Sequence, residues 1–256
     1  MARIIAISNQ KGGVGKTTTA INLSAYLAQS GKKTLLVDMD AQCNATSAFG
    51  IRPEEAEYTV YDMLIDSHPA AEMLIQTELE NLKLIPAHID LSTTDIELST
   101  RMAREYILKR MLEPIAGDFD YILLDCPPSF GLLTLNALTA ATYVLIPLQC
   151  EYYALEGLSR LQNMIDLIKV NTNPDLYIGG ILFTLYNGRT KLSLQVVNEV
   201  KKYYPEVVYE TMIPRNVRLS EAPSHGLPIN LYDPKSKGAL AYEALAEEVM
   251  KRDQIG

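Results

Sequence analysis

Residues 8–18 read Ser8-Asn9-Gln10-Lys11-Gly12-Gly13-Val14-Gly15-Lys16-Thr17-Thr18, between a short apolar run at 3–8 and a helical pattern at 16–30. Glycines let such a loop curl until its backbone N–H groups point at phosphate oxygens, and the start of the helix adds a positive dipole end. The Lys16 ammonium can reach the β- and γ-phosphates, and the Thr17 hydroxyl can ligate Mg²⁺. The stretch therefore predicts a phosphate-binding loop for Mg-ATP, made by Lys11, Gly12, Gly13, Val14, Gly15, Lys16, Thr17 and Thr18.

This loop departs from the usual pattern G-x-x-x-x-G-K-[ST], because Gln10 occupies the position of the first glycine. It carries a second lysine, Lys11, at its start instead. The sequence has no Asn-Lys-x-Asp motif for recognising guanine, so we expect ATP rather than GTP as the nucleotide.

Outward from the loop, short apolar runs alternate with longer helical patterns. Strands are expected at 3–8, 33–37, 83–86, 121–125, 143–147, 177–183 and 207–213, and helices at 16–30, 91–112, 155–170, 191–203 and 238–251. Shorter helices at 60–65 and 70–76 are expected in a peripheral excursion. Strands that alternate with helices predict βαβ units, and hence an α/β fold with a doubly wound, mostly parallel sheet flanked by helices. No linker divides the chain, so we expect a single domain over residues 1–256.

Carboxylates follow two of the expected strands. Asp38 and Asp40 end the run at 33–37, and Asp125 ends the run at 121–125. Ligands of open α/β sheets lie beyond the carboxyl ends of the strands, so these acids should meet the phosphate loop. Asp125 is our candidate for holding Mg²⁺, directly or through water, and Asp40 for orienting the attacking water. Asp38 is expected to support the loop or the metal shell.

The composition is that of an ordinary globular protein, with 48% hydrophobic and 21% charged residues. No signal-peptide pattern or membrane-spanning run is apparent, and three scattered cysteines without a C-x-x-C pair favour a reducing compartment, so we expect a cytoplasmic protein. The net charge of −8 argues against nucleic acid as a partner, but its distribution is uneven. Acids dominate residues 54–120 and bases dominate residues 189–237, which keeps the question open.

Five segments resemble the ParA/MinD ATPases, and among these the Soj-type chromosome-partitioning ATPases. They are KGGVGKTT at 11–18, VDMDAQ at 37–42, DCPPS at 125–129, QCEYYALEG at 149–157 and IPRNVRLSEAPSHG at 213–226. The first three are similar to the deviant Walker A, A′ and B motifs of the family. Together the segments extend the resemblance over nearly the whole chain.

The resemblance implies a slow ATPase that acts as a switch in chromosome or plasmid partitioning. ATP binding would form a homodimer in which Lys11 reaches the partner's nucleotide, so Lys11, Lys16 and Asp40 are the catalytic candidates. Pro214 and Asn216 would contact the base and sugar. The ATP-bound dimer would bind DNA without sequence preference on the nucleoid, and a ParB/Spo0J-like protein would stimulate hydrolysis.

Two residues depart from the family pattern: Ala41 where many relatives have proline, and Asn187 where relatives often have an acid. The first should alter only the stiffness of its loop, whereas the second bears on recognition of the base.

The candidate DNA-binding residues are Arg189 and Arg218, both within the basic segment. Four further candidates in that segment are Lys201, Lys202, Lys235 and Lys237. The alternative is that these side chains form solvated surface pairs with neighbouring acids such as Glu199, Glu221 and Asp233.

Three other functions are compatible with such a loop. A membrane-positioning ATPase like MinD would need a basic amphipathic C-terminal helix, but the pattern at 242–256 is mixed and partly acidic. An iron–sulfur protein like the nitrogenase iron protein would need suitably placed cysteines, and Cys126 and Cys150 do not match. A DNA-binding module that uses ATP only structurally would not need Asp40.

Overall fold

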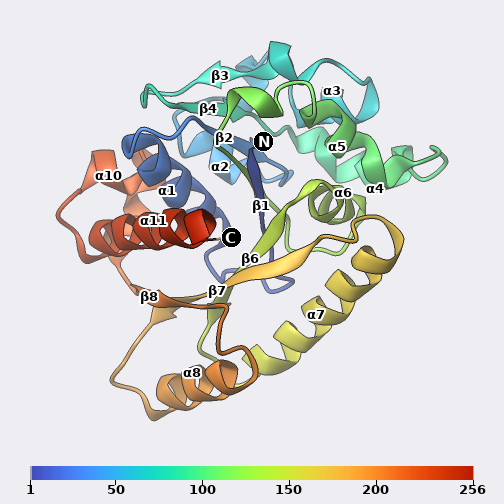
Figure 1. Ribbon diagram of the computed structural model, residues 1–256. Helices are drawn as coiled ribbons and strands as arrows, with labels where there is room; N and C mark the ends of the chain where they lie inside the picture. Colours follow the sequence, from blue (N-terminus) through green and yellow to red (C-terminus); the bar gives the residue numbers. More distant parts are fainter. Residues whose placement is uncertain (1, 256) are drawn as a thin grey trace.

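The computed structural model describes residues 2–255 and contains one eight-stranded sheet in the order β3-β4-β2-β5-β1-β6-β7-β8 (Figure 1). Neighbouring strands are parallel except for the β3–β4 pair, which is antiparallel. The strands are β1 (Arg3–Ile7), β2 (Thr34–Asp38), β3 (Ile75–Gln76), β4 (Leu82–Ile85), β5 (Tyr121–Asp125), β6 (Tyr143–Gln149), β7 (Tyr177–Tyr186) and β8 (Val208–Pro214). The α/β fold with a mostly parallel sheet, expected from the sequence, is confirmed.

Helices cover both faces of the sheet. They are α1 (Lys16–Gln29), α2 (Asn44–Ser47), α3 (Val60–Ile65), α4 (Thr94–Glu97), α5 (Ile107–Leu112), α6 (Leu132–Ala140), α7 (Ala154–Asn171), α8 (Lys191–Tyr203), α9 (Val217–Glu221), α10 (Ile229–Tyr232) and α11 (Lys237–Ile255). Short 3₁₀ helices are η1 (Pro53–Glu55), η2 (Ala70–Met73), η3 (Ile89–Thr93), η4 (Arg104–Tyr106), η5 (Ala116–Asp118) and η6 (Ala222–His225). In Figure 1, α1 and α11 lie on one side of the sheet, and α5, α6 and α7 lie on the other.

Two hydrophobic clusters fill the space on either side of the strands. Alternate residues of one strand enter different clusters: Leu36 packs with the α1 and α11 side, whereas Leu35 and Val37 pack with the opposite side. Because both faces are covered, the central strands are apolar at consecutive positions, which is the pattern seen in the sequence.

The single helix expected at 91–112 is wrong. The chain there forms η3, α4, η4 and α5, with Ala103 in the left-handed region at φ 52° between α4 and α5. Asn136 of α6 decides where α5 begins, because its Oδ1 accepts the N–H of Leu108 at 3.1 Å and its Nδ2 donates to the carbonyl of Arg104 at 2.9 Å. The helical pattern at 70–76 is also wrong beyond Met73, since Ile75–Gln76 is strand β3. Neither β3 nor α6 was expected from the sequence.

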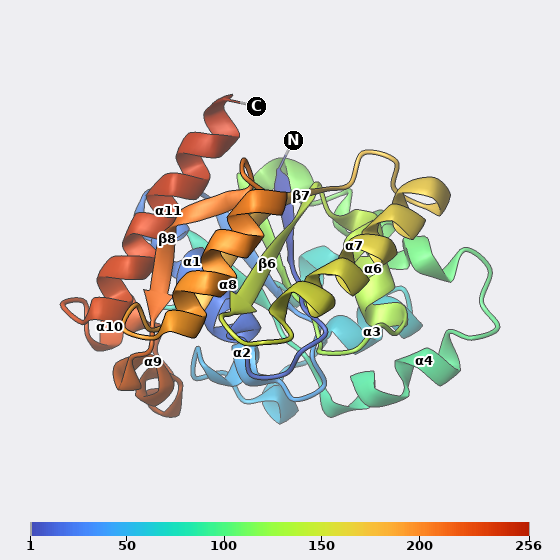
Figure 2. The same cartoon turned by 90° about the horizontal axis from the view of Figure 1, so that it is seen from below.

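The carboxyl ends of the parallel strands meet at one edge of the sheet. The arrows of β6 and β8 point toward this edge in Figure 2, where α2 and α9 also lie. The register places Ile7 of β1 beside Asp125 of β5, and Asp125 beside Asp38 of β2. Three strand ends are therefore level with one another at the point where the phosphate loop leaves β1.

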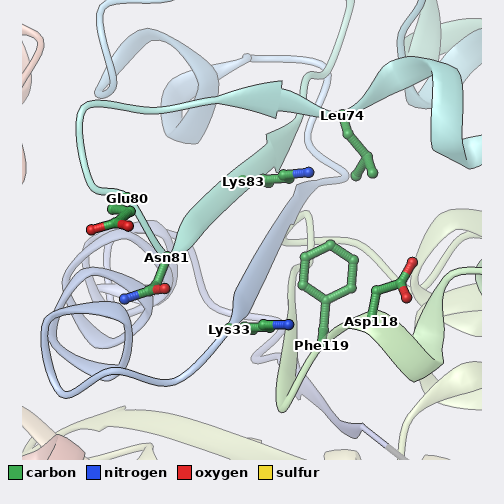
Figure 3. Close-up of a pocket in the computed structure, with 7 residues that line it drawn as sticks. All are labelled: Lys33, Leu74, Glu80, Asn81, Lys83, Asp118 and Phe119. Atoms are coloured by element: carbon green, nitrogen blue, oxygen red, sulfur yellow. The ribbon is translucent and has the colours of Figure 1, made fainter.

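A cavity of about 290 Å³ lies at the opposite edge, where β2, β4 and β5 begin. Figure 3 shows Lys33 and Lys83 pointing toward the ring of Phe119 in this cavity. Its lining contains none of the residues that the sequence singled out, and these residues lie instead at the other edge.

Candidate nucleotide-binding site

The loop at 8–18 curls at two left-handed glycines, Gly13 at φ 74° and Gly15 at φ 84°, and Gly15 caps the start of α1. An ideal Cβ at Gly12 or Gly13 would meet nothing within 4 Å, so the glycines leave open space for a ligand at the surface of the loop. Lys16 is buried, and its ammonium donates to the carbonyl of Lys11 at 3.1 Å across the loop. Burial lowers the pKa of Lys16, and the nearby charge of Asp125 opposes that shift.

Side chains from neighbouring strands hold this loop in place. Asn9 donates to the carbonyl of Pro147 at 2.8 Å and accepts the N–H of Lys11 at 3.0 Å. Thr184, in β7, donates to the carbonyl of Val14 at 2.7 Å in a buried hydrogen bond. The protein's own side chains therefore hold the shape of the loop.

Asp125 lies fully buried at the end of β5, and neither of its carboxylate oxygens has a hydrogen-bond partner among residues 2–255. Burial raises the pKa of Asp125 well above its usual value, and the charge of Asp38 adds to the effect. The Thr17 side chain lowers this pKa, yet it does not reach hydrogen-bond geometry with either oxygen. Two buried oxygens without partners, next to a threonine, fit a site for a hard divalent cation.

Asp38 is also fully buried, but its oxygens are occupied. One accepts the N–H of Asp40 at 3.2 Å, and the other accepts the N–H and the hydroxyl of Thr46 at 2.8 and 2.7 Å. Burial raises the pKa of Asp38 to about 6, against the lowering effect of these hydrogen bonds. Asp38 therefore holds the segment that follows β2, at Asp40 and Thr46, and makes no hydrogen bond with the described residues of the phosphate loop.

Asp40 lies just beyond the end of β2 and is half-buried. Its Oδ1 accepts the N–H of Gln42 at 3.0 Å. The structure thus brings Lys16, Asp125 and Asp40 to one edge of the sheet, and the charges of both acids act on Lys16.

A cavity of about 160 Å³ adjoins the phosphate loop at Gly15 and Thr18. Pro214 and Asn216, the residues predicted to contact the base and sugar, are among those that line it, and Asn216 also caps α9 by accepting the N–H of Arg218 at 2.8 Å. Sequence reasoning missed three further lining residues, which are Thr184, Leu185 and Tyr242. Only Thr184 had a signal, because it directly follows the strand expected at 177–183.

Asn187, one of the two departures from the family pattern, lies outside this cavity. Its Oδ1 accepts the N–H of Arg189 at 3.1 Å in an exposed turn. The exchange of an acid for asparagine therefore acts on the turn rather than on the cavity lining.

Lys11 is half-exposed and forms an ion pair with Glu151, which precedes α7. Within this one chain, the second lysine of the loop is therefore held by the QCEYYALEG segment. Exposed ion pairs contribute only about 0.2–1 kcal/mol, so another acceptor can replace Glu151 at little cost.

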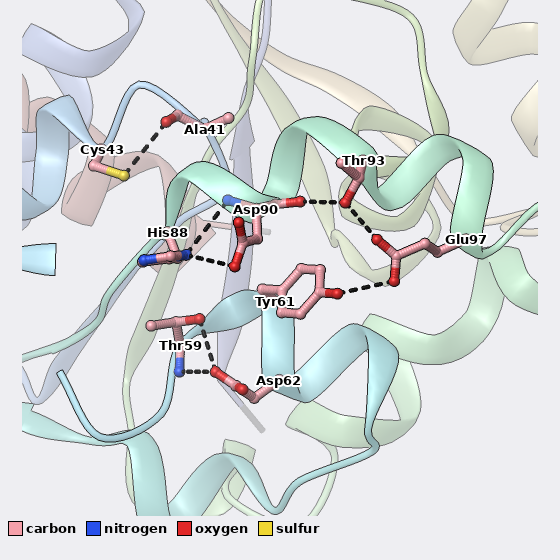
Figure 4. A network of polar contacts seen from close by, with 9 residues as sticks. All are labelled: Ala41, Cys43, Thr59, Tyr61, Asp62, His88, Asp90, Thr93 and Glu97. Carbon is pink, nitrogen blue, oxygen red and sulfur yellow. Dashed lines mark hydrogen bonds and ion pairs between the residues drawn. The ribbon is translucent and has the colours of Figure 1, made fainter. Parts of the chain in front are cut away.

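Polar contacts also organise the segment beyond β4 (Figure 4). His88 pairs with Asp90 at 3.0 Å, and Tyr61 donates to Glu97 at 2.9 Å. None of these side chains lines the cavity beside the phosphate loop, and the described residues contain no group of three or more His, Cys, Asp or Glu that could hold a metal. The three cysteines, Cys43, Cys126 and Cys150, are free and buried, and burial raises the pKa of each thiol.

The two candidate DNA-binding arginines differ in their surroundings. Arg218, on α9, forms ion pairs with Glu221 at 2.8 Å and with Asp233 at 3.4 Å. Arg189 is exposed between β7 and α8 and has no ion pair with any residue of 2–255. Of the four lysines, Lys202 pairs with Glu199 at 3.8 Å.

The chain is similar to proteins of known families. A family described as an AAA domain matches residues 2–178. The sporulation initiation inhibitor protein Soj of Bacillus subtilis is 57% identical, with 97% of this chain and 98% of that protein covered. The chromosome partitioning protein ParA of Myxococcus xanthus is 56% identical, with 99% and 89% covered.

A solved structure also matches over almost the whole chain. It is the cobyrinic acid a,c-diamide synthase from Mycobacterium smegmatis with bound ADP and magnesium, which superposes with a TM-score of 0.86 at 40% identity and with 99% and 96% of the two chains covered. With the Soj and ParA relatives matched end to end, the chain belongs to the ParA/Soj family of partitioning ATPases.

Proposed function

We propose that this protein is an ATP-driven switch that forms a homodimer on Mg-ATP, binds DNA without sequence preference, and leaves it after hydrolysis. The observation that carries the proposal is the level placement of three strand ends beside one loop. Ile7, Asp125 and Asp38 share a register, and the loop that follows Ile7 has the glycines and lysines that a triphosphate requires.

The residues have separate tasks in this site. Backbone N–H groups of residues 11–18 and the Lys16 ammonium would hold the phosphates, and the cavity with Pro214 and Asn216 would take the base and sugar. Thr17 and Asp125 would hold Mg²⁺, directly or through water, which neutralises phosphate charge when bound. Asp40, which is half-buried and whose charge acts on Lys16, would orient the attacking water.

Lys11 supports the dimer in this proposal. Its ion pair with Glu151 lies on the surface, where an ammonium at the start of the loop can exchange Glu151 for the phosphates of a partner's nucleotide. Exposed Tyr152 and Tyr153 follow Glu151 directly and would enter the same interface. A ParB/Spo0J-like protein would act on this dimer to stimulate hydrolysis.

The packing of α11 weighs against a membrane-positioning role of the MinD kind. Tyr242, Leu245 and Val249 are buried, and Glu248 accepts the N–H groups of Glu210 and Thr211 at 2.9 and 3.0 Å. The apolar side of this helix is thus already used inside the protein. No helix within residues 2–255 is long and apolar enough to cross a membrane.

The proposal is tested by steady-state hydrolysis and light scattering of the purified protein with ATP, ADP or no nucleotide, with and without Mg²⁺. We expect slow hydrolysis that needs Mg²⁺, and a doubling of the scattering mass with Mg-ATP but not with ADP or without nucleotide. A protein that stays monomeric with ATP, or that does not hydrolyse it, would contradict the proposal.

A further inference from the structure

Two glycines far apart in sequence bring the two halves of the candidate site into backbone contact. Gly50 follows α2 and Gly226 follows η6, and both are left-handed, at φ 71° and 68°. An ideal Cβ at Gly226 would lie 2.9 Å from the Cα of Gly50 and 3.1 Å from its nitrogen. A side chain at position 226 would therefore push two backbones apart, because neither neighbour is the flexible end of a side chain.

Gly50 belongs to the hydrolytic half of the site. Its N–H donates to the carbonyl of Ser47 at 3.0 Å, which ties it to the end of α2. One residue earlier, Thr46 donates twice to Asp38, and the hydroxyl of Thr46 also accepts the N–H of Ala87 at 3.0 Å. Asp38 in turn accepts the N–H of Asp40. Hydrogen bonds to Asp38 and Ser47 therefore connect Asp40, Thr46 and Gly50 within the segment 40–50.

Gly226 belongs to the base-binding half. Its N–H donates to the carbonyl of Pro223 at 3.0 Å, and Pro223 lines the cavity beside the phosphate loop. Leu219 and Ser220 of α9 line the same cavity. Gly226 is therefore joined through Pro223 to the wall of the base cavity.

We propose that the Gly50–Gly226 contact sets the distance between the base cavity and Asp40, which makes Gly226 a positioning residue for ATP hydrolysis. The inference rests on the proposed ATPase function. A bound base would hold the cavity wall formed by α9 and η6 in place. Through the Gly50–Gly226 contact, that wall would then hold the hydrogen-bonded segment 40–50, and with it Asp40, at a fixed distance. The loop at 11–18 makes no part of this contact, so phosphate binding does not depend on it.

The chain offers a matched control in Gly31, which follows α1. It is left-handed at φ 80°, like Gly226, but a Cβ there would meet nothing within 4 Å. Gly226→Ala and Gly31→Ala therefore carry similar backbone strain, and only the first adds a clash. Gly50→Ala is a useful third variant, because its Cβ would lie 3.7 Å from the nearest atom, the carbonyl oxygen of Gly226.

The test measures kcat and KM for ATP in these variants. We expect Gly226→Ala to lower kcat by about 10- to 100-fold, as an error of about 1 Å in a catalytic group does, with a change in KM no greater than about threefold. Gly31→Ala should keep the wild-type kcat, and Gly50→Ala should lose much less than Gly226→Ala. Equal kcat values in Gly226→Ala and Gly31→Ala would overturn the inference.

A second pair, Gly226→Asn and Gly31→Asn, covers the case in which the alanine variant does not fold. Asparagine adopts the left-handed region more readily, but it keeps the Cβ that clashes. The same loss of kcat is expected in Gly226→Asn, and a kcat equal to that of Gly31→Asn would overturn the inference. Wild-type protein without ATP hydrolysis would instead contradict the proposed function, so the two failures are distinguishable.

Discussion

Lys16 places a buried ammonium at the centre of the loop, where burial already lowers its pKa. Hydrogen bonds to charged groups contribute about 1.5–3 kcal/mol each, so Lys16→Ala should weaken ATP binding by at least about tenfold. Titration with a fluorescent ATP analogue measures this loss. Lys169→Ala, an exposed change on α7, serves as the control and should bind normally. Unchanged affinity in Lys16→Ala would remove the phosphate-loop interpretation.

Asp40 is the residue on which hydrolysis should depend. Asp40→Ala is expected to bind ATP and to lose turnover by at least about 100-fold, the lower range for a group that handles the proton of the nucleophile. Asp40→Asn keeps an acceptor for the N–H of Gln42 and therefore separates loop structure from charge. Light scattering should show a long-lived ATP dimer for Asp40→Ala. Normal turnover, or a protein that stays monomeric with ATP, would refute the assigned role.

Lys11 should separate nucleotide binding from dimerisation. Lys11→Ala leaves Lys16 in place, so we expect it to bind ATP, to stay monomeric and to respond hardly at all to a stimulating partner. Glu151→Ala removes the other half of the same ion pair and should still dimerise, because it frees Lys11. Light scattering with ATP compares the two variants. A normal ATP-dependent dimer of Lys11→Ala would count against a role across the subunit boundary.

Among the elements, α6 depends on a cap from another helix. Gly131 precedes α6 and offers no side chain, and the Oδ1 of Asp95 in α4 accepts the N–H of Leu132 at 2.8 Å. Loss of such a cap costs about 1 kcal/mol, so Asp95→Ala should lower the free energy of unfolding by that amount, whereas Asp95→Asn keeps an acceptor and most of the stability. Urea unfolding measures both, and an Asp95→Ala variant as stable as wild type would contradict the assignment.

The same elements show why sequence reasoning succeeded in some places and not in others. Strands β1, β2 and β5 were predicted because their apolar runs lead into the glycine-containing loop or end in an aspartate. Helix α6 was missed because it is buried nearly all round, so its apolar residues have no helical period. The expected helix at 91–112 failed because Asn136 imposes a new start on α5. Local patterns cannot show contacts of that kind.

The residues of the candidate site could also be predicted from the sequence only in part. Lys16, Asp40 and Asp125 come from motifs that each follow one strand, and they could be named from the sequence. The cavity beside them joins β7, β8, α9 and α11, so Leu185 and Tyr242 had no local signal. The Gly50–Gly226 contact depends on two distant turns and appears only in the folded chain.

At the scale of the whole molecule, the proposed DNA binding would have to overcome a net charge of −8. A dimer doubles any basic patch and raises the effective concentration of the second half. Arg189 is the stronger candidate because it has no acidic partner among residues 2–255, whereas Arg218 is held by Glu221 and Asp233. We expect Arg189→Glu to weaken DNA binding more than Arg218→Glu does, measured by fluorescence anisotropy. A larger loss of DNA binding in Arg218→Glu than in Arg189→Glu would indicate instead that α9 contacts the DNA.

The most direct test of the switch is DNA binding of the wild-type protein with ATP, ADP and no nucleotide, titrated at several salt concentrations. The account predicts binding with ATP only, equal for unrelated DNA sequences, and a logarithmic salt slope of about 0.9 for each phosphate neutralised. Binding that is the same in all three nucleotide states, or absent in all of them, would contradict it.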